Sequence, residues 1–312
     1  MPEDESFAWR PQPDPLLAGA IDMHVHGFPD IGMAHEARTD DLTMISLARA
    51  YGLRGLVLKS HFWPTMDRAF QLAERLAAPD FTVFGSITLN PLVGGILPMS
   101  VEAAAAHGAK VVFLPTWGAR NDHERRGIVR KAVIDPCFPS IPAYLETGSL
   151  TVLDVDGALT PAMREIVALC KRHAMVLSTG HVSVAESVAI AEYAREQRFE
   201  KLLFAHPFSG SIGATMEDAL KMAELGAFIE FTFAGSISVN HAVPSRSVLD
   251  AVRTIGPERC IITTDAFFEY IPPQPEALRT FTHQLRFIGC SDADLRRMIV
   301  GNPSQLLDVT TA

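Results

Sequence analysis

Short apolar runs alternate with amphipathic stretches along most of this chain. The runs are rich in β-branched and aromatic residues and predict eight strands, at residues 20–26, 55–61, 81–88, 110–116, 175–181, 201–206, 226–233 and 260–265. Helical periodicity occupies the stretches between them, at residues 40–51, 67–77, 100–107, 161–173, 184–197, 215–224 and 245–255. Near-continuous apolar strands that alternate with helices indicate a parallel sheet covered on both faces. Eight such units favour an α/β fold closed into a (β/α)8 TIM barrel over an open doubly wound sheet.

Two segments depart from this alternation. Residues 1–18 contain several prolines and predict an extended N-terminal arm. The remainder, 19–312, is long enough for a single barrel domain, because such barrels commonly reach about 250 residues or more. Within it, residues 117–160 form an insertion after the fourth strand, and a connection of this length is usually a lid or an oligomer contact. The arm and the insertion are therefore candidate contacts for a homo-oligomer.

Composition narrows the classes of protein. Hydrophobic residues make up 48% of the chain, which is enough for a large core, and the net charge of −9 argues against nucleic-acid and anionic-membrane partners. The four cysteines, at 137, 170, 260 and 290, are widely spaced and indicate reduced thiols rather than disulfides. Neither a secretory leader nor an apolar stretch of membrane-spanning length is apparent. We expect a cytoplasmic protein.

Metal-ligand residue types recur where the predicted strands end. The first strand carries Asp22-Met-His-Val-His26, and alternate residues of a strand share a face, so Asp22, His24 and His26 are expected to point one way. Later strands end in the residues Lys59 and His61, Thr116, His181, His206 and Asp265. In a closed barrel the eighth strand lies beside the first, which brings Asp265 next to the histidine pair. Four imidazoles and a carboxylate then converge at the rim, where barrel enzymes place their catalytic groups.

With this combination of residues the chain resembles the metal-dependent amidohydrolase superfamily. Its ending, Asn302-Pro-Ser-Gln-Leu-Leu307, is also similar to that of many members. The segments 55–61 and 89–95 look like those of a poorly characterised branch of amidohydrolase relatives. The resemblance covers residues 20–308 and implies a barrel with one or two divalent metals. The ligands that it implies are His24, His26, Lys59, His181, His206 and Asp265.

The bridging ligand departs from the commonest pattern. Binuclear superfamily members often bridge two metals with a carboxylated lysine that ends strand four, but here that strand ends at Thr116. Lys59 ends strand two, from which some members supply the bridge. A buried unpaired ammonium is costly, so Lys59 is expected to be neutral, paired or carboxylated. One hypothesis has a carboxylated Lys59 bridging two metals, and the other has an ammonium paired with Asp22 or substrate beside one metal.

A divalent metal lowers the pKa of bound water and polarises a carbonyl group. Asp265, with Lys59 and His206, is the predicted catalytic set, in which Asp265 accepts the proton of the water and later passes it to the leaving group. His181 and His206 complete the coordination or hold the carbonyl oxygen. Asp22 is expected to orient His24 or His26. Zinc is the first expectation for the metal, and manganese, iron and cobalt are also compatible with these ligands.

Other residues near the predicted rim are open to two interpretations. His61 is either a metal ligand or a substrate contact, and Glu230 is interpreted as a paired structural carboxylate rather than a catalytic one. Asp265 has the alternative role of a helix cap. Aromatic side chains, foremost Trp63, Trp117, Phe233 and Phe267, follow the strand ends and predict a largely apolar pocket.

The leading function is a metal-dependent hydrolase that cleaves an amide, cyclic amide, lactone or ester bond in a small, partly apolar molecule. A metal-dependent decarboxylase of an aromatic or unsaturated acid is the alternative, because barrels of this superfamily also catalyse that reaction. A third possibility is a barrel that binds ligand without turnover. Phosphate-binding loops, dinucleotide fingerprints and the nucleophile elbow are absent from the sequence.

Overall fold

The computed structural model describes residues 11–31, 39–127, 129–130, 134–135, 138–239 and 241–310. The first ten residues of the predicted arm, parts of the insertion and Cys137 lie outside these ranges. The described part of the arm turns back onto the barrel, where Leu16 and Leu17 are buried.

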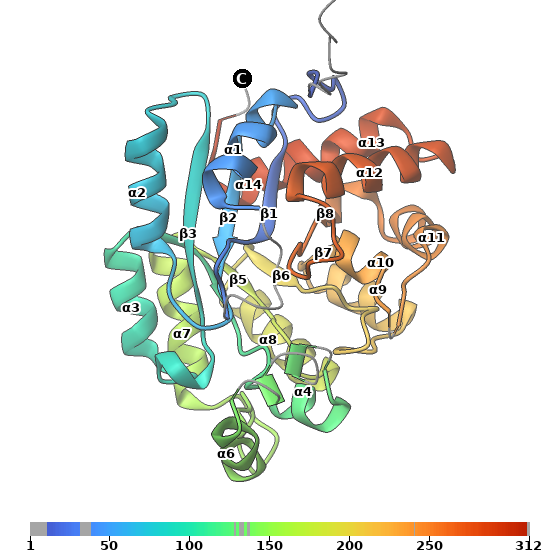
Figure 1. Cartoon of the computed structure of the whole chain (residues 1–312). Coiled ribbons are helices and arrows are strands. Elements are labelled where there is room, and N and C mark those ends of the chain that lie inside the picture. Colours follow the sequence, from blue (N-terminus) through green and yellow to red (C-terminus); the bar gives the residue numbers. More distant parts are fainter. Residues whose placement is uncertain are drawn as a thin grey trace, which may run out of the picture.

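Eight parallel strands form one sheet in sequence order, curled into a barrel (Figure 1). Their bounds are β1 Ile21–His26, β2 Gly55–Lys59, β3 Thr82–Thr88, β4 Ala109–Phe113, β5 Val176–Ser178, β6 Leu202–Phe204, β7 Phe228–Thr232 and β8 Cys260–Thr263. The predicted TIM barrel is confirmed. Most strands stop up to three residues earlier than predicted, because the residues after the last ladder position leave the sheet to form the rim of the barrel.

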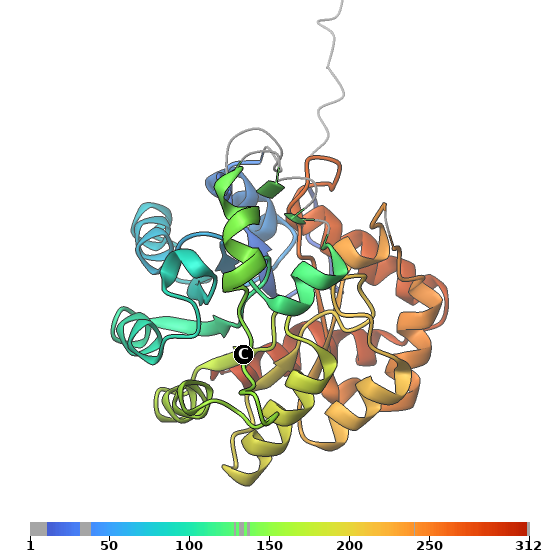
Figure 2. The same ribbon diagram turned by 90° about the horizontal axis from the view of Figure 1, so that it is seen from below.

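Helices surround the strands, as the view along the barrel in Figure 2 shows. Their bounds are α1 Asp41–Ala50, α2 Met66–Leu76, α3 Pro98–Ala106, α4 Arg120–Arg125, α6 Ser140–Gly148, α7 Pro161–Arg172, α8 Val184–Glu196, α9 Met216–Glu224, α10 Phe233–Ser236, α11 Ser245–Ile255, α12 Gln274–Phe287, α13 Asp292–Arg296 and α14 Asn302–Leu307. All seven predicted helices are present with ends within two residues. Helix α12 was not predicted, since prolines at 272, 273 and 275 obscure its start.

Between β8 and β1 the barrel closes through a few specific bonds. Val25 and Ala266 form an isolated parallel bridge, and the Asp265 amide donates to the carbonyl of His24 over 2.8 Å. The Thr264 hydroxyl donates to Asp22 over 2.6 Å. These bonds fix the position of Asp265 relative to the histidine pair.

One apolar cluster fills the inside of the barrel, and a larger one lies between the strands and the surrounding helices. Met23, Val57 and Phe113 belong to the cluster inside the strands, and Leu306 and Leu307 of α14 complete it from the end opposite the rim. The Asn302 side chain donates to the carbonyls of Pro257 and Cys260, over 2.8 and 2.7 Å. The Asn-Pro-x-x-Leu-Leu ending is therefore a structural plug of the barrel.

Strand β1 does not alternate regularly as predicted. The pairing of β1 with β2 shifts between Asp22 and Val25. Met23 consequently packs inside the barrel, whereas Asp22 faces outward and accepts a hydrogen bond from Gln274 of α12 over 2.6 Å. The prediction that Asp22 shares a face with His24 and His26 is wrong, because the irregularity interrupts the two-residue period.

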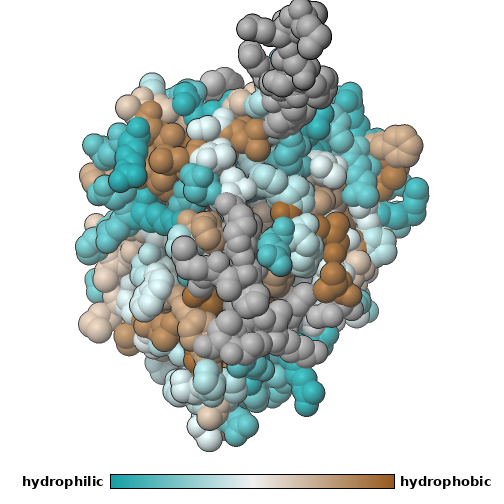
Figure 3. Space-filling view, in the orientation of Figure 1, coloured by the Kyte–Doolittle hydropathy of each residue, from teal (hydrophilic) through white to brown (hydrophobic). Residues whose placement is uncertain are grey.

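The described helices include none that is long and apolar enough to cross a membrane. Cys170, Cys260 and Cys290 are buried free thiols, consistent with the prediction of reduced cysteines. On the face shown in Figure 3, apolar side chains stand in small groups among hydrophilic ones.

Candidate metal centre

The histidine pair of β1 and Asp265 converge at the carboxyl end of the barrel. The Nε2 atoms of His24 and His26 lie 3.0 and 3.2 Å from the same oxygen, Oδ1 of Asp265. Lys59 comes in from β2, and its Nζ lies 2.8 Å from Nε2 of His24. Two imidazole nitrogens, a carboxylate oxygen and an amine therefore meet at one place.

Every imidazole of this centre has its Nδ1 atom held by another side chain. The pairs are His24 with Glu230 at 3.0 Å, His26 with Asp30 at 2.7 Å, His181 with Asp122 at 2.6 Å and His206 with Ser209 at 3.0 Å. Fixing Nδ1 in this way sets the orientation of each ring and leaves Nε2 as the nitrogen available for a metal. Carboxylates that hold metal-binding imidazoles through the second nitrogen are the usual support of histidine metal sites.

His206 and His181 complete the ring of imidazoles from β6 and β5. The His206 ring centroid lies 6.0 Å from that of His24 and 5.1 Å from that of His181. His206 and Asp265 both have positive φ, 22° and 49°. Such backbone is costly for residues other than glycine, and it turns both side chains inward just past the ends of their strands.

Burial and charge act in opposite directions on these groups. Burial alone would lower the pKa of His24, but the carboxylates of Asp265 and Glu230 raise it to about 9. Burial lowers the pKa of His206 to about 3, together with the charge of His181. Burial alone would raise the pKa of Asp265. The charge of His24 and the hydrogen bonds from His24 and His26 outweigh burial, so this pKa lies well below its usual range. The carboxylates thus favour a positive charge between His24 and Asp265.

Lys59 lies inside the barrel and is almost completely buried. Burial lowers the pKa of its amine, although Asp265, Glu230 and Asp30 act in the opposite direction. Among the described residues Lys59 forms no ion pair, and its amine lies 4.9 Å from the centroid of the Phe113 ring. The expected pairing with Asp22 is not found, since Asp22 is bonded to Thr264 and Gln274.

Asp22 also differs from the role predicted for it. It accepts a hydrogen bond from the backbone amide of His24 over 3.1 Å, but it does not contact the imidazole of His24 or His26. Glu230 and Asp30 orient those rings instead.

His61 stacks on His26, with ring centroids 4.3 Å apart. Its Nδ1 shares the Asp30 oxygen that also bonds His26, at 2.7 Å. His26, Asp30 and His61 form a second group of potential metal-binding atoms, next to the group of His24, His26 and Asp265. His61 also lines the cavity described below, so both of its predicted roles, ligand and substrate contact, remain open.

The predicted aromatic residues separate into three groups. Phe267 packs edge-on against His61 at 4.7 Å and lines the cavity. Trp117 is buried behind the centre, and its indole donates to the His61 carbonyl over 3.1 Å. Phe233 packs on Phe281 in the outer layer, and Trp63 is 59% exposed, so neither is a wall of the cavity. Position after a strand end does not reveal which way a side chain points.

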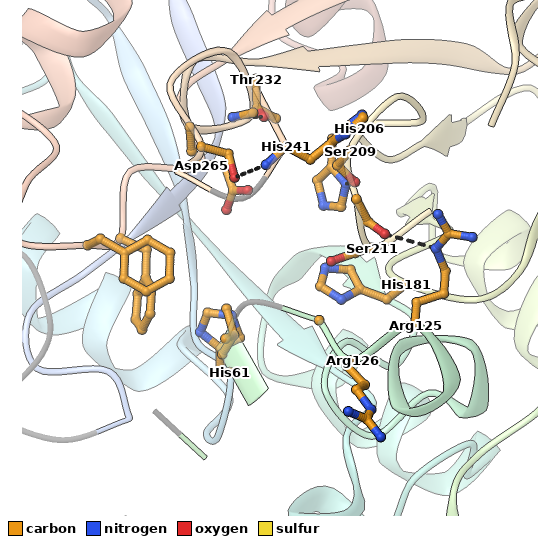
Figure 4. A pocket seen from close by; sticks show the side chains of 18 of the residues that line it. His61, Arg125, Arg126, His181, His206, Ser209, Ser211, Thr232, His241 and Asp265 are labelled. Atoms are coloured by element: carbon orange, nitrogen blue, oxygen red, sulfur yellow. Dashed lines mark hydrogen bonds between the residues drawn. The ribbon is translucent and has the colours of Figure 1, made fainter. Parts of the chain in front are cut away.

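A cavity of about 240 Å³ opens above the imidazoles (Figure 4). Phe267, Phe268 and Tyr270 form an aromatic wall on one side. The residues from α4 and from the loops after β5, β6 and β7 are largely polar or basic; they include Arg125, Arg126, His181, Ser209, Ser211 and His241. The pocket therefore has the predicted aromatic side, but its lining as a whole is mixed, because the insertion contributes charged side chains to the rim.

Three acidic residues of the centre were missed or undervalued. Asp30 and Asp122 were not predicted, since each lies in a segment without periodic pattern, and Glu230 was interpreted as only structural. The useful signal for Glu230 was an acidic side chain in an otherwise apolar strand, β7. Such a residue needs a buried partner, and that partner is His24.

The charges and donor atoms of the centre fit a divalent cation. Glu230 and Asp122 each retain a buried oxygen without a hydrogen-bond partner among the described residues, Oε2 and Oδ2. Buried carboxylates that lack full compensation are costly, and a cation at the imidazole Nε2 atoms would offset their charge. Imidazole nitrogen and carboxylate oxygen together suit zinc, manganese, iron or cobalt.

Solved structures with the same fold include three that match over most of this chain. An amidohydrolase from Pseudomonas aeruginosa is 12% identical, with a TM-score of 0.62, and the match covers 94% of this chain and 96% of that one. A lactonase from Listeria monocytogenes is 13% identical, with a TM-score of 0.57 and coverage of 95% and 97%. An N-acetyl-D-glucosamine-6-phosphate deacetylase from Mycobacterium smegmatis is 15% identical, with a TM-score of 0.55, and the match covers 94% of this chain and 76% of that one.

At these identities the comparison establishes the fold, and it confirms the expected likeness to amidohydrolases at that level. No curated protein matches the chain. A family model does match, over residues 19–230, which include β1 to β6, the first three residues of β7 and every residue of the candidate centre except Asp265. On this evidence the chain belongs to the family of unknown function designated DUF6282.

Proposed function

We propose that this protein is a metal-dependent hydrolase that cleaves an amide, cyclic amide, lactone or ester bond in a small molecule. The observation that carries the proposal is the group of His24, His26 and Asp265, whose potential ligand atoms lie within 4.8 Å of one another. Around it stand imidazoles whose Nδ1 atoms are tied to protein partners. The names of the structural neighbours, which include an amidohydrolase, a lactonase and a deacetylase, support the same class of reaction.

We assign the ligands to His24, His26, His181, His206 and Asp265, with Lys59 as a further ligand. A bound divalent cation supplies a nucleophilic water at neutral pH and polarises the target carbonyl. Zinc is the metal we expect, since its sites commonly combine imidazole nitrogen with carboxylate oxygen.

We assign the proton transfers of the reaction to Asp265. Its carboxylate is 24% exposed and faces the cavity, whereas the carboxylate of Glu230 behind His24 is completely buried. An aspartate is ionised at neutral pH, so Asp265 can accept a proton from the attacking water and deliver it to the leaving nitrogen or oxygen. His206, assigned above as a ligand, keeps its second ring nitrogen on Ser209 over 3.0 Å.

We propose that Lys59 is carboxylated when metal is bound. Formation of the carbamate needs a neutral amine, and burial of Lys59 favours the neutral form. Intact-mass measurement of the native protein tests this assignment. The wild-type protein should be heavier than its sequence mass by one carbon dioxide, and a Lys59→Arg variant should not. An unmodified lysine beside a single ion would leave the one-metal alternative.

Turnover tests the proposed reaction. Wild-type protein loaded with zinc is offered a panel of N-acyl amino acids, lactones and cyclic amides, and Asp265→Asn loaded in the same way is the comparison. We expect hydrolysis of at least one class, reduced by about a hundredfold or more in Asp265→Asn because a general base contributes roughly that much. Release of carbon dioxide from aromatic acids, without hydrolysis of the panel, would support the decarboxylase instead.

A further inference from the structure

The cavity above the imidazoles has an unusual charge for an acidic protein. Although the chain has a net charge of −9, the lining of the cavity includes Arg125 and Arg126, and Asp265 is the single aspartate or glutamate among the described lining residues. Lys59 and Asp265 lie at the floor, within the candidate metal centre. The two arginines therefore make the outer part of the cavity basic. A concave basic site concentrates anions against a negative background.

Arg125 is held in a defined position at this rim. Its Nε donates to the carbonyl of Gly210 over 2.8 Å, and the rest of the guanidinium has no partner among the described residues. Gly213, with φ of 66°, lies directly against the guanidinium, so a Cβ atom there would come within 2.0 Å of Nη2. Anchoring at Nε leaves the terminal amines of the fork available for an acceptor.

The helix that carries Arg125 is fastened to the centre itself. Asn121, one turn earlier on α4, donates to the carbonyls of His181 and Ser211, both over 2.9 Å. Asp122, the next residue, bonds the His181 imidazole. The position of Arg125 is thus tied to the same loops that hold the imidazoles, and Figure 4 shows Arg125, Ser211 and His181 near one another at this side of the cavity.

Arg126 and His241 extend the basic rim. Both are exposed and line the cavity, and neither side chain forms a hydrogen bond or ion pair within the described part of the chain. Ser211 and Ser238 add hydroxyl groups to the same lining. Opposite them stands the aromatic wall of Phe267, Phe268 and Tyr270, which accommodates an apolar body rather than a charge.

From this arrangement we infer that the substrate is an acid: its carboxylate or phosphate group binds at Arg125, its apolar part packs on the aromatic wall, and its scissile bond lies over the metal centre. The inference rests on the proposed hydrolase function and adds the substrate class. Arg125 then selects anionic substrates over neutral ones of the same shape, because a charge-assisted fork bonds an oxyanion at two points.

Binding of ligands that the enzyme cannot hydrolyse tests this inference without turnover. The full-length protein loaded with zinc is titrated calorimetrically with 3-phenylpropanoate, with 2-phenylethyl phosphate and with the neutral 3-phenylpropan-1-ol. We expect an anion to bind more tightly than the alcohol, and Arg125→Ala to weaken that anion by about ten- to a hundredfold, the effect of one or two charged hydrogen bonds. The anion that binds more tightly identifies whether the site prefers a phosphate or a carboxylate.

Three variants make the result specific to Arg125. Arg120→Ala removes an exposed arginine from the same helix that does not line the cavity, and it should leave binding unchanged. Arg125→Lys keeps the charge without the fork and should lie between wild type and Arg125→Ala. Gly213→Ala displaces the guanidinium without removing it and should also weaken the anion.

Two outcomes would overturn the inference. Equal affinity for anion and alcohol would show that the rim does not distinguish charged ligands from neutral ones. An anion that binds tightly but equally to wild type and Arg125→Ala would be held by other groups, such as the metal, and not by Arg125. Either result leaves the hydrolase function intact, whereas absence of hydrolysis together with anion binding that depends on Arg125 would remove the function and keep the anion site.

Discussion

Replacing Glu230 by glutamine is expected to weaken zinc binding although Glu230 itself is not assigned as a ligand. Its Oε1 atom lies 3.0 Å from Nδ1 of His24 and accepts from the Thr263 hydroxyl over 2.9 Å, in a completely buried position. Glutamine keeps the volume and one acceptor but removes the negative charge. The imidazole of His24 then becomes a poorer electron donor, and the buried cation loses a compensating charge.

Loss of such a supporting carboxylate typically lowers metal affinity by about ten- to a hundredfold, which corresponds to about 1.4 to 2.7 kcal/mol. Competition against a chromophoric zinc chelator measures this change directly. Glu186→Gln is a matched control, since Glu186 is also a buried glutamate. It lies on the outer helix α8, and its carboxylate accepts hydrogen bonds from the backbone amides of Val152 and Ser183. The control should lose stability without losing zinc affinity.

Thermal unfolding of the metal-free proteins separates folding from binding. If Glu230→Gln remains folded and binds zinc as tightly as wild type, the imidazole of His24 does not depend on its carboxylate. The assignment of His24 as a supported ligand would then be wrong.

Three further predictions concern other groups. Burial raises the pKa of Asp22 to about 6 from 3.8, so ionised Asp22 destabilises the fold increasingly as pH rises from about 4 to 6; the stability of Asp22→Asn relative to wild type should therefore increase by about 2 kcal/mol across that range, and a constant difference in denaturant titrations would contradict this. Asp122→Asn should weaken zinc binding by about tenfold through His181, in the same competition assay, and unchanged affinity would remove His181 from the ligand set. Cys170 should resist thiol reagents until the protein unfolds, because it is buried and burial raises its pKa; rapid labelling of the native protein would contradict its placement.

The barrel and the convergence at its rim could be predicted from the sequence because both follow from one topological rule. When eight parallel strands close, the ends of the first and last strands become neighbours, so Asp265 had to approach His24 and His26. Strand periodicity also places Lys59 inside the barrel, and the structure agrees.

Local irregularity and loop geometry set the limits of that prediction. The shift in β1 that turns Asp22 outward has no sequence signal, since every residue of the strand is buried. Asp30 and Asp122 reach their imidazoles from loops and a short helix, where no repeating pattern relates sequence position to direction. The basic rim was missed for the same reason, as Arg125 belongs to the insertion.

Diffraction from crystals of the zinc-loaded protein, with anomalous scattering recorded at the zinc edge, tests the metal centre most directly. An anomalous peak should appear about 2.0 to 2.1 Å from the Nε2 atoms of both His24 and His26, next to Asp265. A folded, zinc-saturated protein whose ion lies elsewhere, with His24 and Asp265 still bonded to each other, would contradict the assignment.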